Sequence, residues 1–152
     1  MSRRRGFSLI ELLVVFVVLG ILAGIAVLRY VDLRNHAEVS AIIGDLGTIR
    51  VGAYNYWADK DKFPPDAGAG VVPAGMAPYL NGGFSFTRAK YTLDWENFQG
   101  GTGAGGMQVG VMVTSPDSRL MALLARRAAG GLPYFVAGNT VAFIIVGPDG
   151  RM

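Results

Sequence analysis

The sequence predicts an α+β protein in which a long N-terminal α-helix packs on a small antiparallel β-sheet. Three observations support this fold class. The chain opens with an apolar run of membrane-spanning length, a helical stripe of apolar residues follows it, and the second half contains short segments of strand pattern between Gly-rich turns. We therefore expect an apolar helical segment, an amphipathic helical segment, and a head domain of residues 59–152.

The first element is the apolar run of residues 7–28, in which residues 12–28 carry no charge. As an α-helix this run would be about 33 Å long, which matches a hydrocarbon layer of roughly 30 Å. Arg3, Arg4 and Arg5 precede it, which favours a cytoplasmic N-terminus and an exported head. Glu11 lies near the start of the run, where a carboxylate is costly unless it has a partner.

Two simple interpretations of this segment are a cleaved secretory signal peptide, with small residues at 24–26, and a plain single-pass anchor. The run is long for a signal peptide and it carries a charge. A plain anchor leaves the combination of basic leader, Gly6, Phe7 and Glu11 unexplained.

The stretch "RRRGFSLIELLVVFVVLGILAGIA" resembles the class III signal of type IV pilins and type II secretion pseudopilins. The resemblance implies a leader of residues 1–6, cleavage by a prepilin peptidase between Gly6 and Phe7, and N-methylation of Phe7. It also implies that the apolar helix is retained. We expect Glu11 of one subunit to pair with the Phe7 ammonium of a neighbour. In a low dielectric such a charge pair attracts the two helices and also fixes their register relative to each other.

The second element is the amphipathic continuation over residues 29–58. Apolar residues recur there at spacings of three and four, at Val39, Ile42, Leu46, Ile49, Ala53 and Tyr56. We expect one helix from Phe7 to Ala58 whose second half packs this stripe on the head. Gly44, Gly47 and Gly52 each lower helix propensity by about 1 kcal/mol, which leaves the straightness of the helix open.

The head begins with a Pro- and Gly-rich loop that contains Phe63-Pro64 and a short turn or helix at 78–80. Alternating or apolar runs predict strands at 90–96, 107–114, 134–137 and 140–146, and an apolar face predicts a helix at 117–129. A sheet of three or four antiparallel strands laid on one helix face is sufficient to bury a small core.

Composition excludes several classes of protein. There is no cysteine and His36 is the one histidine, so thiolate and multi-histidine metal sites are excluded. Outside residues 1–6 the chain has as many acidic as basic residues, so the pI near 9.4 predicts no nucleic-acid partner. We expect no cofactor and no metal.

Three motifs resemble functional sites but are better explained structurally. GTGAGG at 101–106 precedes a strand, so it fits a hairpin loop rather than a dinucleotide site. The aspartates of the Lys-containing loop lack the ligand set of an EF-hand and fit a solvated loop better than a calcium site; they are Asp59, Asp61 and Asp66. Asp94 and Glu96 would point to one face of a strand and could form a carboxylate pair, but exposed strand carboxylates are far commoner than glycosidase pairs. We expect no enzyme.

The sequence therefore predicts a structural filament subunit that is stored in the bacterial inner membrane. By resemblance, it assembles with itself and other pilin-like subunits into a periplasmic pseudopilus or cell-surface pilus. An inner-membrane platform protein and a cytoplasmic ATPase drive that assembly. The absence of Cys, and of Pro before Pro64, favours a pseudopilin or minor pilin. The alternative is a membrane-anchored binding module that does not polymerise and does not need Glu11.

Overall fold

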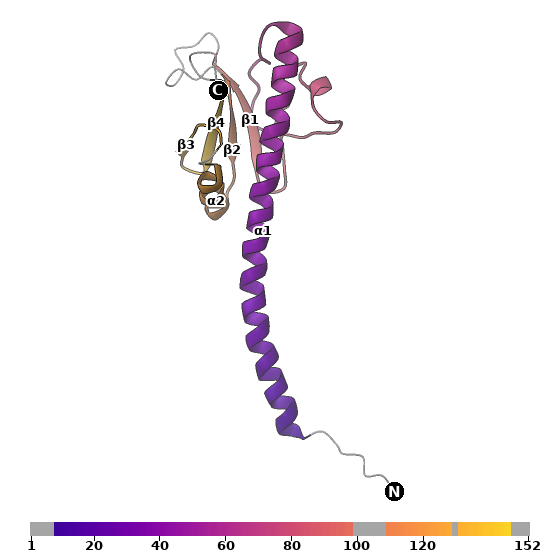
Figure 1. The fold of residues 1–152 in the computed structure, drawn as a ribbon, viewed down its shortest axis with the longest axis vertical. Coiled ribbons are helices and arrows are strands. Elements are labelled where there is room, and N and C mark those ends of the chain that lie inside the picture. Colours follow the sequence, from indigo (N-terminus) through magenta and orange to yellow (C-terminus); the bar gives the residue numbers. More distant parts are fainter. Residues whose placement is uncertain (1–7, 99–108, 129–130, 147–152) are drawn as a thin grey trace. The chain divides into compact units, whose positions relative to one another are not determined.

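The computed structural model describes residues 8–98, 109–128 and 131–146, and it has the predicted α+β fold (Figure 1). The chain divides into two compact parts, residues 1–37 and residues 38–152. The elements, in chain order, are α1 (Leu9–Lys60), the 3-10 turn η1 (Ala77–Tyr79), β1 (Thr92–Asn97), β2 (Val109–Thr114), α2 (Ser118–Ala128), β3 (Tyr134–Ala137) and β4 (Thr140–Val146).

The helix α1 begins at Leu9 and ends at Lys60, each within two residues of the predicted bounds. It ends because Asp61 adopts a left-handed backbone conformation with a φ of 54°, while its N–H donates to the Trp57 carbonyl at 2.7 Å. Pro64 and Pro65 follow and lack the N–H groups that a further turn would need.

The predicted stripe on α1 is confirmed as the helical side of the core. All six of its residues are buried, with between 0 and 7% of their surface exposed. Five of them, all except Tyr56, form one cluster with the inward-facing residues of the sheet, among which Leu93, Trp95 and Phe143 are the largest. Trp95 is fully buried, and its indole N–H donates to the Pro64 carbonyl at 3.1 Å, so no polar atom of this side chain is left without a partner.

The sheet contains four antiparallel strands in the order β1-β2-β4-β3. The strand positions were predicted, whereas the order was not. The segment between β2 and β4 holds both α2 and β3, and the tight turn at Gly138, with a φ of 60°, returns β3 into β4. Asp117 caps α2 because its Oδ1 accepts the N–H groups of Arg119 and Leu120 at 3.0 and 3.1 Å.

A polar cluster ties the turn before β1 to α1. Asp45 accepts two hydrogen bonds from the Arg88 guanidinium, both at 2.8 Å, and one from the Tyr91 hydroxyl at 2.7 Å. Burial, followed by the hydrogen bond to Asp45, raises the pKa of Tyr91 well above its usual range, so the hydroxyl stays a donor. The cluster therefore fixes one end of the sheet against the helix.

Candidate functional site: the apolar segment of α1 and its first-turn carboxylate

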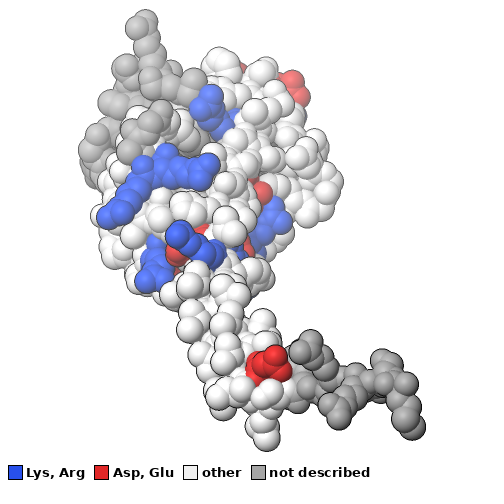
Figure 2. Space-filling model, turned by 60° about the horizontal axis from the view of Figure 1, so that its bottom comes forward, with Lys and Arg blue, Asp and Glu red and all other residues white. Residues whose placement is uncertain are grey.

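The N-terminal half of α1 exposes apolar side chains on every side. Each large apolar residue from Leu9 to Leu33 has between 40 and 84% of its surface exposed. By length and composition this helix is able to cross a membrane. Figure 2 shows the surface of this segment as almost wholly uncharged, with one acidic patch at its end. A helix that is apolar all round must be covered by lipid or by other chains.

Glu11 occupies the first turn of this helix and contacts its own backbone. The Ser8 N–H donates to Glu11 Oε2 at 2.8 Å, and the Ser8 carbonyl accepts from the N–H groups of Glu11 and Leu12 at 3.1 and 3.3 Å. Ser8 is thus the N-cap and Glu11 the third helical residue, and the bond from the Ser8 N–H to Glu11 is one of the two hydrogen bonds of a capping box. The helix dipole also favours an acid at this end.

The capping role of Glu11 was missed in the sequence analysis, although Ser8-Leu9-Ile10-Glu11 has the spacing of a capping box before an apolar run. The carboxylate is held at the start of the helix through Oε2. Within the described ranges, its Oε1 has no hydrogen-bond partner. One oxygen therefore orients the side chain and the other is available to a cation.

The remaining predicted site residues of this segment cannot be placed. Gly6, Phe7 and the basic residues Arg3, Arg4 and Arg5 lie outside the described residues. The GTGAGG loop at 101–106 also lies outside them. His36 is exposed on α1.

The head contains a carboxyl pair that differs from the predicted one. Asp94 and Glu96 do share a face of β1, but the group that hydrogen bonds to Glu96 is Asp66 from the preceding loop. Burial, followed by the charges of Asp66 and Asp94, raises the pKa of Glu96 to about 7. Burial also raises the pKa of Asp94. This pair holds a proton more tightly than isolated carboxyls do.

The other predicted acidic cluster does not converge on one point. Asp59 accepts the Tyr79 hydroxyl at 3.0 Å, whereas Asp66 accepts the Asn97 N–H at 3.4 Å near the end of β1. In the described part of the chain, no group of three or more His, Cys, Asp or Glu side chains is arranged to hold a metal ion. Ser115 is buried and donates to the Lys90 carbonyl at 2.7 Å, which is a structural role.

Comparison with known proteins extends these observations. Residues 1–27 match the family model of the prokaryotic N-terminal methylation motif. The chain is 35% identical over 79 residues to the fimbrial protein EcpC of Eikenella corrodens, covering 51% of this chain and 52% of that protein. It is 33% identical over 64 residues to the type II secretion system core protein G of Klebsiella pneumoniae, covering 42% of this chain and 46% of that protein.

A longer match joins the chain to the type IV major fimbrial protein FimA of Dichelobacter nodosus. The two are 27% identical over 132 residues, which covers 86% of this chain and 78% of that protein. In contrast, the matches to the first two relatives cover only about half the length of those proteins. No solved structure matches the chain.

Proposed function

We propose that the chain is a pseudopilin or minor pilin of a helical filament, a non-enzymatic structural subunit of the type IV pilin and type II secretion pseudopilin family. The observation that carries the proposal is the N-terminal half of α1, which exposes apolar residues on every side and holds one carboxylate at its first turn. The unbroken run of α1 from Leu9 to Lys60 and the absence of Cys support the finer assignment.

In this proposal a prepilin peptidase removes the leader, residues 1–6, and methylates Phe7. Residues 7–28 span the inner membrane with the N-terminus in the cytoplasm, residues 29–58 continue the helix, and residues 59–152 form the exported head. A platform membrane protein and a cytoplasmic ATPase then move the subunit into a pseudopilus or pilus, where it contacts copies of itself and other pilin-like subunits.

The apolar helix by itself supplies little selectivity for this transfer. Lipid tails are about as apolar as leucine side chains, so exchanging lipid for neighbouring helices changes the hydrophobic energy little. The selectivity must come from packing and from polar contacts. Glu11 is suited to that role because the Ser8 N–H holds Oε2, while Oε1 has no hydrogen-bond partner among the residues that the structure describes.

Cleavage between Gly6 and Phe7 would create the missing cation. A free amine at Phe7 of one subunit could pair with Glu11 of its neighbour. Two unit charges 4 Å apart attract by about 4 kcal/mol at an effective dielectric constant of 20, and desolvation offsets part of this. A subunit inserted with the wrong stagger would leave both charges unpaired in an apolar layer, so the pair would select the register.

The test replaces Glu11 by Gln. Glutamine keeps an oxygen that accepts the Ser8 N–H, so the helix cap is retained while the charge is removed. We expect normal membrane insertion and cleavage but at least a tenfold loss of filaments, measured by shearing and sedimentation. Ser8→Ala is the matched control in the same turn and should assemble normally. Normal filament yield from Glu11→Gln would refute the assembly role of the carboxylate.

Intact-mass analysis of the membrane form tests the processing step separately. We expect a chain that starts at N-methylated Phe7. A chain that retains residues 1–6 would contradict the proposal and support a membrane-anchored module that does not polymerise. A chain that starts near Val27 would instead indicate an ordinary secreted domain.

A further inference from the structure

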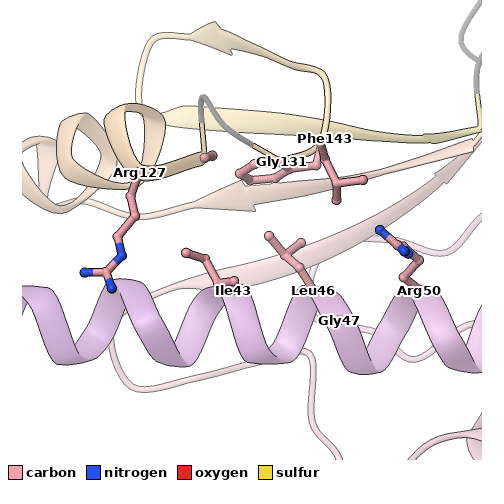
Figure 3. A pocket seen from close by; sticks show the side chains of 9 residues that line it. Ile43, Leu46, Gly47, Arg50, Arg127, Gly131 and Phe143 are labelled. Atoms are coloured by element: carbon pink, nitrogen blue, oxygen red, sulfur yellow. The ribbon is translucent and has the colours of Figure 1, made fainter. Parts of the chain in front are cut away.

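A groove with an apolar floor lies between α1, α2 and β4 in the head. Its volume is about 340 Å³, and Ile43, Leu46 and Phe143 form its floor. Arg127 reaches down from α2 at one end and Arg50 rises from α1 at the other, with Ile43 and Leu46 between them (Figure 3). We call this site the basic groove.

Among the described residues, neither arginine of the basic groove has an acidic partner. The ion pairs of that part of the chain are Arg88–Asp45 and Lys90–Glu38, and neither involves Arg50 or Arg127. Guanidinium groups bind carboxylates strongly and also bind the faces of aromatic rings. The groove therefore fits a ligand in which a carboxylate lies beside an aromatic or apolar group.

The C-terminal end of α1 presents these two groups together, in what we call the aromatic-acidic knob, Trp57 and Asp61. Trp57 is 44% exposed, and its ring stacks on that of Phe63, with ring centroids 6.2 Å apart. Asp61 is exposed, and within the described ranges its side chain has no ion pair or hydrogen bond.

Asp61 ends α1 in a left-handed conformation, with a φ of 54°, which aspartate tolerates better than most residues other than glycine. It also places a negative charge at the end of α1 that carries the negative pole of the helix dipole. A residue that breaks local rules without a compensating contact in its own chain marks a candidate interaction site.

The basic groove and the aromatic-acidic knob cannot meet within one molecule. Both lie on the rigid helix α1, where Trp57 follows Arg50, the groove residue nearest to it in the chain, by seven residues, or about 10 Å along the helix axis. We propose that the knob of one copy docks into the groove of a second copy, an inference that rests on the proposed filament function. The contact joins two different surfaces, so repeating it builds an open filament when the rotation between copies does not close a ring.

Lys60 and Lys62 flank Asp61 and oppose the contact through their charge. The contact therefore depends on burial of the Trp57 ring over the apolar floor as well as on the carboxylate. Tryptophan and arginine are the residues that most often dominate protein interfaces. The groove supplies two arginines and the knob supplies the tryptophan.

The absence of cysteine from the chain allows a direct test by cross-linking. Asp61→Cys combined with Arg127→Cys in the full-length chain should give a ladder of disulfide-linked multimers in oxidised filaments. Each single variant should not, because the contact joins two different surfaces. Asp61→Cys with Arg119→Cys is the matched control: Arg119 lies eight residues earlier on α2, about 12 Å away, beyond disulfide reach.

A second pair of variants tests the groove itself. A Cβ at Gly47 or at Gly44 would meet no atom within 4 Å, so both positions accept a larger side chain, but only Gly47 lines the groove. We expect Gly47→Leu to fill the groove and to reduce the Asp61–Arg127 cross-link at least fivefold. Gly44→Leu should leave it unchanged.

The outcomes separate this inference from the proposed function. If wild-type filaments form but the ladder is absent, or if it is equally strong with Arg119→Cys, the docking inference is wrong and the filament function stands. If the ladder persists in Gly47→Leu filaments, the groove is not its site. If no wild-type filaments form, both proposals fail.

Discussion

Gly52 is the glycine of α1 at which a side chain has no space. A Cβ built there would lie 2.8 Å from Leu80 Cδ2 and 3.0 Å from the Tyr79 carbonyl oxygen. The Tyr79 atom belongs to the backbone at η1, so it cannot move away as a flexible side chain could. The absence of a Cβ therefore lets the segment 76–80, with the buried Met76, approach the helix closely.

Two opposing effects decide whether Gly52→Ala raises or lowers the free energy of unfolding. Alanine raises helix propensity by about 1 kcal/mol relative to glycine. Overpacking against a closed backbone costs about 1–3 kcal/mol. We expect a net loss of about 1 kcal/mol, which lowers the midpoint of thermal unfolding by roughly 5 °C for a domain of this size.

Gly44 and Gly47 provide matched controls on the same helix. A methyl group at either position would have no atom within 4 Å, so Gly44→Ala and Gly47→Ala gain helix propensity without a clash. We expect each to raise the unfolding midpoint by a few degrees, measured by tryptophan fluorescence of the full chain in detergent. An unfolding midpoint for Gly52→Ala equal to those of the two controls would refute the argument from close approach.

Two further predictions concern charged groups of the head. The raised pKa of Glu96, about 7 against 4.5 in the unfolded chain, means that the folded state binds the proton more tightly. The contribution of Glu96 to stability is therefore fully present below about pH 4.5 and is lost as the pH rises through 7, by about 1 kcal/mol after solvent screening. Glu96→Gln should weaken this dependence in thermal unfolding between pH 5 and 8. Asp45→Asn removes the charge that Arg88 and Tyr91 bind, and should cost about 2 kcal/mol in denaturant unfolding. The pair of Lys90 and Glu38 is the control, because it makes a single contact at 3.3 Å and the Glu38 side chain is more exposed than that of Asp45, so Glu38→Gln should change stability by less than about 0.5 kcal/mol. Equal losses for the two variants would contradict the role of the Asp45 cluster.

Periodicity was sufficient to predict the helix and its buried face. The stripe from Val39 to Tyr56 is buried as predicted. This face could be predicted because a helix turns by a constant angle per residue, so apolar residues spaced three and four apart lie on one side of it. The apolar segment with Glu11 was predicted for a similar reason, since length, charge and composition are properties of a contiguous stretch. The capping box at Ser8 was also readable from spacing, and was overlooked.

Contacts between distant segments depended on the tertiary structure. The strand order β1-β2-β4-β3 could not be derived, because strand patterns specify which face is buried but not which neighbour is paired. The same holds for the pairing of Glu96 with Asp66, the need for glycine at position 52, and the meeting of Arg50 with Arg127 at one groove. The sequence by itself determined the elements and the surfaces that must be covered. Only the tertiary structure decided which side chains that are far apart along the chain come into contact, because those contacts depend on how the elements pack.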